Sequence, residues 1–244
     1  MSRSSLFSKS DESRDAEIFS KRSALVSFWL LCRSSNEAFS INEVARELDL
    51  SPGTAHRVVT ALEYEGIVHA HGFRTKKRFT LVKPKNLLIA WLKSYHFRKK
   101  VKTRQFAVTD RQVLTNKRLK MDSELTPALH TAAREIFRAR ATNLSTLELY
   151  LPHWSSIDSI ARGLGLIEQE RGYEVLILQP YYPVVVERFK NSSTPEFWRE
   201  AFAILTFLDL YGFPLRGREA AETMFRRTKV LSRICTWSEI EKIE

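Results

Sequence analysis

Polar and basic side chains are concentrated in two short segments of the first third of the chain, spaced to contact a nucleic acid. The first segment carries Ser51, Thr54, His56, Arg57 and Thr60. The second carries four cations just after a glycine, at Arg74, Lys76, Lys77 and Arg78. Hydroxyl, imidazole and guanidinium groups can donate hydrogen bonds to base edges, and clustered cations neutralise phosphates. These residues therefore favour DNA recognition.

Motifs that would carry catalysis are missing from the sequence. It contains no HExxH zinc motif, no P-loop, no GxGxxG and no GxSxG. His69 and His71 alternate along a predicted strand, but two histidines without a third ligand make a poor metal site. Acidic residues such as Asp158 and Glu174, with Lys190, leave a metal-dependent nuclease as an alternative, although their spacing matches no motif. We therefore expect no enzyme, no metal and no cofactor.

The elements that position the polar residues begin with a short helix and a turn. Ser40 can cap the helix, and Glu43 completes a capping box three residues later. Apolar residues recur at the spacing of one helical face, at Ile41, Val44, Ala45 and Leu48. Leu50 lies in the turn, where it can fill the space between two helices.

A second helix is predicted from Ser51 to Gly66. Ser51 can cap it, Pro52 suits the first helical position, and Gly66 is a typical residue just past a helix end. One face is apolar, with Ala55, Val58, Val59 and Leu62. The polar residues Thr54, His56, Arg57 and Thr60 are left near the N-terminal end, which reaches base edges in helix-turn-helix proteins.

Two short strands, 67–70 and 79–82, are predicted to enclose a basic hairpin tip. Gly72 permits the sharp turn, and four cations follow it. Such a wing would lie along phosphates or enter the minor groove. The alternative is an ordinary solvated hairpin. The order helix, turn, helix and basic hairpin favours a winged helix-turn-helix that binds double-stranded DNA at an operator.

The stretch SPGTAHRVVTALEYEGIV (51–68) resembles the recognition segment of winged-helix regulators such as the IclR family. The similarity covers the recognition helix, and many families share it. It implies that Thr54, His56 and Arg57 are the residues most like the DNA-contacting positions of that family. It also suggests a regulator whose C-terminal domain binds a small effector.

The net charge of +11 is unevenly distributed. Residues 1–97 carry 15 Lys and Arg against 10 Asp and Glu, residues 98–120 carry 9 against 1, and residues 121–244 carry 15 against 17. The basic excess thus accompanies the DNA-binding pattern, as expected when phosphate contacts supply non-specific affinity. Further phosphate contacts are expected from Lys99, Lys100, Lys102 and Arg104. Their segment is either a flexible basic arm or a structured one with a short strand at 105–108.

We expect four segments along the chain. They are a flexible, serine-rich tail over 1–20, a winged helix-turn-helix domain over 21–83, a linker helix with the basic segment over 84–120, and a C-terminal domain over 121–244. The linker helix begins at Pro84 and buries one face, either within the chain or against a second copy.

The C-terminal segment mixes two hydrophobic periods. Helices are predicted near 129–141, 155–165, 197–210 and 218–227, and strands near 147–151, 173–180 and 184–189. Interleaved helices and strands predict an α/β or α+β fold class for this domain, behind the winged helix.

The stretch LDLYGFPLRGREAAETMF (208–225) resembles the C-terminal part of AbiEi-type antitoxins of type IV toxin–antitoxin systems. LHTAAR (129–134) and TNLSTLELYLP (142–152) extend the similarity. The resemblance implies a winged-helix domain before an α/β domain and repression of the protein's own promoter. It also implies that the protein neutralises a nucleotidyltransferase-like toxin without a stable complex.

Three residues of this turn are candidates for function. In physical terms, Asp209 is expected to cap a backbone turn or to pair with Arg216 or Arg218, and Gly217 to relieve strain at the break. The alternative is that the two arginines contact a protein or a nucleic acid.

Cellular location is suggested by what surrounds these motifs. Cys32 and Cys235 have no CxxC spacing, which suits buried thiols in a reduced cytosol. No apolar run is long enough to span a membrane, and the N-terminus does not read as a signal peptide. We expect a cytoplasmic, nucleoid-associated transcriptional repressor of the antitoxin type, binding as a homodimer. An effector-responsive regulator and a DNA-targeted nuclease are the alternatives.

Overall fold

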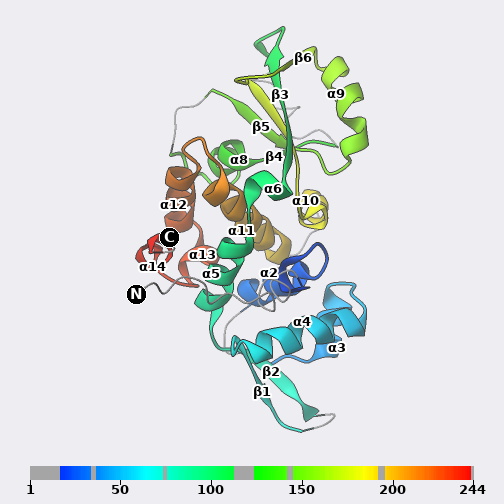
Figure 1. Ribbon diagram of the computed structural model, residues 1–244, viewed down its shortest axis with the longest axis vertical. Coiled ribbons are helices and arrows are strands. Elements are labelled where there is room, and N and C mark those ends of the chain that lie inside the picture. The colour runs from blue at the N-terminus through cyan, green and yellow to red at the C-terminus, as the bar shows by residue number, and fades with distance from the viewer. Residues whose placement is uncertain are drawn as a thin grey trace, which may run out of the picture. The chain divides into compact units, whose positions relative to one another are not determined.

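The computed structural model describes residues 17–33, 37–73, 76–112, 124–141, 145–191 and 196–242. The chain divides into two compact units (Figure 1). Unit 1 runs to Ser94 and also includes the C-terminal stretch from Ile234, and unit 2 is Tyr95–Arg233. Most of the predicted tail, the predicted wing residue Arg74 and the end of the predicted basic segment lie outside the described residues.

Unit 1 is a helical unit with one β-hairpin. Its elements are α2 (Ala24–Cys32), α3 (Ile41–Glu47), α4 (Pro52–Tyr64), β1 (Val68–His71), β2 (Arg78–Leu81), α5 (Pro84–Ser94) and α14 (Trp237–Glu241). The capping box of Ser40 and Glu43 forms as predicted and starts α3. The apolar face predicted for the second helix is buried in α4.

The helix that precedes the helix-turn-helix is the centre of this core. All residues of α2 from Ala24 to Leu31 are buried. Trp91 of α5 packs against the rings of Phe19 and Phe28, with centroid distances of 5.3 and 4.6 Å. Of the two predicted alternatives for the face of α5, the structure has the one in which it packs within the chain.

The hairpin is connected to the helix-turn-helix by an isolated β-bridge. Strands β1 and β2 pair antiparallel, with Val68 opposite Leu81 and His71 opposite Arg78. Phe39, just before α3, exchanges two backbone hydrogen bonds of 2.8 Å with Phe79 of β2. These two hydrogen bonds connect the wing to the residues that lead into α3.

Unit 2 mixes helices with a sheet, which confirms the predicted fold class. Its elements are α6 (Phe97–Lys100), β3 (Lys102–Val108), β4 (Thr126–Pro127), α8 (Leu129–Glu135), β5 (Leu147–Tyr150), η3 (Trp154–Ser156), α9 (Ile157–Gly163), β6 (Leu166–Gln169), β7 (Val175–Gln179), α10 (Pro183–Lys190), α11 (Glu196–Gly212), α12 (Gly217–Arg227) and α13 (Lys229–Ser232). The strand order is β4-β5-β7-β3-β6, with β5 and β7 parallel and the other neighbours antiparallel.

Different helices pack on the two faces of the sheet. Alternate strand residues on one face, Phe106, Leu147, Leu149, Val175 and Ile177, form a cluster with Ile157 and Ala161 of α9. Residues of the opposite face meet other helices. Glu148 of β5 bonds Thr131 of α8, and the Tyr150 ring lies 6.1 Å from that of Phe202 in α11. Figure 1 shows α9 beside the sheet, on the other side from α8.

Two predictions for this unit are wrong in detail. Residues 184–189 were expected as a strand but form the helix α10, with Pro183 in its first turn. Val185 and Val186 are buried, and the Phe189 ring stacks on that of Phe202 with centroids 4.0 Å apart. Positions 185, 186 and 189 have the spacing of one helical face. The β-branched run Val184–Val186 concealed this period. The helix expected over 129–141 ends at Glu135.

The basic segment contains a strand. Residues 102–108 form β3, which lies between β7 and β6 in the sheet. Of the two predicted alternatives, the structure therefore has the structured one up to Val108. Residues 113–120 lie outside the described ranges.

Candidate nucleic-acid interface

Helix α4 has the features of a recognition helix. Ser51 caps it, since the Ser51 side chain accepts a hydrogen bond from the Thr54 backbone N–H at 3.2 Å. Gly66, at φ +62°, ends it as predicted. His56, Arg57 and Thr60 are exposed, and Thr54 is half-buried. Because the first turn, Pro52–Ala55, is uncharged, nothing in it offsets the positive end of the helix dipole, which favours an approaching phosphate.

The guanidinium on this face is already engaged by a carboxylate. Arg57 Nε lies 2.7 Å from Glu17 Oε1, and the two side chains are 58% and 32% exposed. Glu17 was not singled out from the sequence, because forty residues separate it from Arg57 and no local pattern joins them. An exposed pair of this kind is worth only about 0–1 kcal/mol, so a better partner can displace it.

The cations of the wing lie along the hairpin. Lys76, Lys77 and Arg78 are all exposed. Lys77 Nζ lies 3.2 Å from a carboxylate oxygen of Glu63 in α4, and Arg78 lies 3.6 Å from Glu43 in α3. These two ion pairs join the wing to both helices of the motif, so the structure brings the predicted residues of α4 and the wing together on one unit.

The predicted phosphate contacts in unit 2 differ in their surroundings. Lys99 and Lys102 are exposed. Lys100 Nζ lies over the ring of Tyr181, 4.9 Å from its centroid. Arg104 is held by two carboxylates, at 2.6 Å from both Asp158 and Glu168, and these bonds raise its pKa above the usual value. Arg104 is therefore already engaged by two carboxylates, and its contact with phosphate stays a prediction.

The C-terminal turn is arranged differently from the prediction. Asp209 is fully buried in α11 and accepts hydrogen bonds from the hydroxyls of Tyr95 and Tyr150, not from Arg216 or Arg218. Burial raises the pKa of Asp209 to about 7, while the two tyrosine hydrogen bonds act in the opposite direction. Asp209 is thus a core residue of unit 2.

The two arginines of the turn remain at the surface. Arg216 adopts a left-handed conformation with φ +52° and pairs with Glu219 at 2.8 Å. The Arg218 guanidinium lies over the Tyr211 ring, 4.5 Å from its centroid. Gly217 is required by close approach, because a Cβ there would lie 2.3 Å from the carbonyl oxygen of Leu210.

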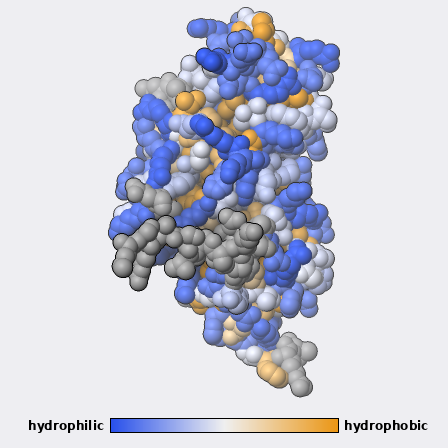
Figure 2. Space-filling view, in the orientation of Figure 1, coloured by the Kyte–Doolittle hydropathy of each residue, from blue (hydrophilic) through white to orange (hydrophobic). Residues whose placement is uncertain are grey.

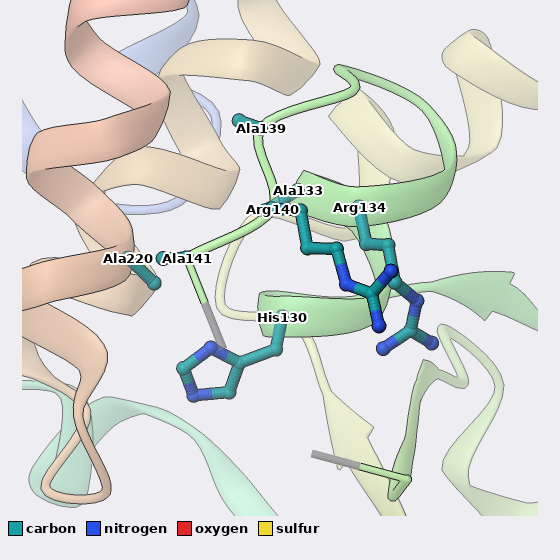
Figure 3. Close-up of a pocket in the computed structure, with 7 residues that line it drawn as sticks. All are labelled: His130, Ala133, Arg134, Ala139, Arg140, Ala141 and Ala220. Atoms are coloured by element: carbon teal, nitrogen blue, oxygen red, sulfur yellow. The ribbon is translucent and has the colours of Figure 1, made fainter. Parts of the chain in front are cut away.

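A small hollow in unit 2 lies between the end of α8 and α12 (Figure 3). It is lined by His130, Ala133, Arg134, Ala139, Arg140, Ala141 and Ala220. His130 Nε2 lies 2.9 Å from the carbonyl oxygen of Leu215, and Figure 3 shows the two arginine side chains extending in a common direction. The space is too tight to admit a water molecule, so it does not hold an effector.

A wider, open groove of about 460 Å³ lies in unit 2 beside α9. Its charged side chains are Arg104, Asp158, Arg162 and Glu168. Arg104 donates hydrogen bonds to both Asp158 and Glu168, which leaves little unsatisfied charge for a ligand.

The described residues also bear on metal binding and on membrane insertion. His69 and His71 do share one face of β1, with ring centroids 4.7 Å apart. Within the described ranges, however, no three His, Cys, Asp or Glu side chains converge to hold a metal ion. Across those same ranges, no helix has the length and apolar character to cross a bilayer.

Two family models match the sequence. The model of the IclR helix-turn-helix domain matches residues 33–72, which include α3 and α4. The model described as a transcriptional regulator, AbiEi antitoxin, of type IV toxin–antitoxin systems matches residues 80–230, more than half of the chain. No curated protein and no solved structure matches. Both resemblances seen in the sequence are thereby confirmed, and the matched families are DNA-binding regulators, not enzymes.

Proposed function

Because the chain belongs to the AbiEi antitoxin family of type IV toxin–antitoxin transcriptional regulators, we propose that it represses its own promoter through α4 and the wing. The observation that supports this most is α4 itself. It is a capped helix with one face in the core and with His56, Arg57 and Thr60 on the opposite, exposed face. Such a helix fits the major groove and presents its N-terminal residues to base edges.

Arg57 is the residue proposed to read a base. A guanidinium can bond guanine through two hydrogen bonds, which discriminates against the wrong base by about 1–3 kcal/mol. The exposed pair of Arg57 with Glu17 is worth about 0–1 kcal/mol. The exchange of the carboxylate for a guanine edge is therefore favourable at a correct site and roughly neutral elsewhere. Thr54, His56 and Thr60 would complete the contacts of α4.

The wing and two basic residues of α6 and β3 are proposed to contact phosphates. Lys76, Lys77 and Arg78 are exposed on unit 1, and Lys99 and Lys102 on unit 2. Each phosphate neutralised by a cation steepens the salt dependence of binding by about 0.9 in a plot of log K against log salt. Binding is therefore expected to weaken steeply with salt.

A gel-shift series on the DNA upstream of the reading frame tests this proposal. Arg57→Ala should weaken binding by about 1–3 kcal/mol, as for a lost base contact. The matched control is Arg226→Ala, which removes the same charge and a similar exposed ion pair, 2.8 Å from Glu222 on α12. Equal affinities of the two variants would remove Arg57 from the base-reading set, and failure of the wild type to bind would contradict the whole proposal.

The second copy of the chain and the toxin are finer parts of the proposal. Two copies on one operator would place their α4 helices about 34–36 Å apart, which a footprint with two half-sites would reveal. Neutralisation of a nucleotidyltransferase-like toxin is assigned to unit 2, because the AbiEi model covers nearly all of it. Arg57→Ala should then still rescue growth in the presence of the toxin, although repression is lost.

A further inference from the structure

One exposed aromatic side chain lies at the end of the wing. The large apolar residues that are exposed among the described ones are Tyr64, Phe73, Val82, Ile167 and Leu215. Phe73 is the most exposed of them, at 76%. Figure 2 shows hydrophobic colour at the end of the β1–β2 hairpin, next to a hydrophilic surface. Water contact with a phenyl ring costs free energy, so its presence at this point calls for an explanation.

The backbone places Phe73 in the turn between β1 and β2. It lies two residues beyond the last strand pair, His71 with Arg78. Gly72 before it has φ +79°, and a Cβ at Gly72 would lie 2.6 Å from the carbonyl oxygen of Lys76. The Lys76 backbone N–H donates a hydrogen bond of 3.1 Å to the Phe73 carbonyl oxygen. The turn is therefore closed in a geometry that only glycine permits and that carries the ring outward.

Among the described residues, three cations of the wing follow this ring in the chain, at Lys76, Lys77 and Arg78. Lys77 forms an ion pair with Glu63, and Arg78 forms one with Glu43. Lys77 also lies over the ring of Phe79, 4.8 Å from its centroid. The described part of the turn thus combines an apolar ring with the exposed Lys76, and the exposed Lys77 and Arg78 follow it in the chain. A ring with cations beside it matches a DNA groove, where phosphates line the rim and apolar sugar faces and stacked bases form the interior.

We propose that Phe73 enters the minor groove of bound DNA and packs against sugars and a base step, which it partly unstacks. Lys76, Lys77 and Arg78 then contact the phosphates on the rim of the groove. Apolar wedges of this type widen or kink the minor groove in other DNA-binding proteins. The proposal rests on the proposed DNA binding of unit 1, and it assigns to the wing a contact that charge alone does not supply.

The test compares four variants by fluorescence anisotropy with the operator duplex over a range of KCl concentrations. Phe73→Ala should weaken binding about tenfold, with an unchanged salt slope, because an apolar contact releases no counterions. Lys76→Ala should reduce the slope by about 1. Tyr64→Ala, which removes a similarly exposed ring at the C-terminal end of α4, is the control and should bind as the wild type does. Phe73→Trp should restore binding.

A second readout reports the base step directly. With 2-aminopurine placed at the step that a hydroxyl-radical footprint assigns to the wing, the wild type should raise the fluorescence and Phe73→Ala should not. Wild-type affinity for Phe73→Ala, or a salt slope that falls as for Lys76→Ala, would overturn the proposal. So would a change in self-association with unchanged DNA affinity, since the ring would then bind a second copy. Absence of DNA binding by the wild type would instead contradict the proposed function.

Discussion

Replacement of Asp209 by asparagine should change how the stability of unit 2 depends on pH. The Asp209 carboxyl is fully buried among α11 and two tyrosines, and burial raises its pKa from the usual 3.8 to about 7. Between these two pH values the folded chain holds a proton that the unfolded chain has released. Folding is therefore favoured at low pH, and this stability is lost as pH rises from about 4 through about 7.

The size of the effect follows from the same two values. The difference between 3.8 and about 7 corresponds to about 4 kcal/mol, at about 1.4 kcal/mol for each pKa unit. The amide of an asparagine side chain does not ionise, so Asp209→Asn should lack this decline. The free energy of unfolding of the variant should gain about 4 kcal/mol relative to the wild type between pH 4 and pH 8.

Urea unfolding at a series of pH values measures the difference between the two proteins. Groups common to both cancel in that difference, which isolates Asp209. Asp158→Asn is the control, since that carboxylate is 72% exposed and its loss removes only a surface pair. If the difference in unfolding free energy between the wild type and Asp209→Asn stays constant from pH 4 to pH 8, the buried carboxyl does not retain its proton and the prediction is wrong.

Three other substitutions test separate contacts. Glu17→Gln should strengthen binding to any duplex severalfold, because Arg57 no longer has to leave a carboxylate 2.7 Å away; anisotropy showing weaker binding would mean that Glu17 instead positions Arg57. Gly217→Ala should destabilise unit 2 by about 3 kcal/mol, because the new Cβ would lie 2.3 Å from the Leu210 carbonyl oxygen, and an unchanged melting temperature would contradict this. Arg104→Ala should leave DNA affinity and its salt slope unchanged, because Asp158 and Glu168 already hold the guanidinium; a slope lower by about 1 would restore Arg104 to the phosphate contacts.

The helix-turn-helix could be predicted almost to the residue, because its signals are local. Ser40 with Glu43, and Ser51 with Pro52, are caps that act within one turn, and both form as predicted. The apolar stripe of α4 needs only the helical period to be recognised. The predicted strands of the wing differ from β1 and β2 by one residue at each end.

Unit 2 was harder to predict because its determinants are distant in sequence. The hydroxyls that donate hydrogen bonds to Asp209 come from residues 114 and 59 positions away, and no pattern within the 208–225 stretch indicates them. The partners of Arg104 lie 54 and 64 positions away, so a cation in a basic segment was interpreted as a phosphate contact. In α10 the strand preference of three valines was overridden by packing against α11.

A promoter–reporter assay is the most direct test of autorepression through α4 and the wing. The DNA upstream of the reading frame drives the reporter, and the wild type, Arg57→Ala and Arg226→Ala are expressed in turn at equal levels. We expect strong repression by the wild type and by Arg226→Ala, and relief of repression by Arg57→Ala. Equal repression by all three proteins, or none by the wild type, would contradict it.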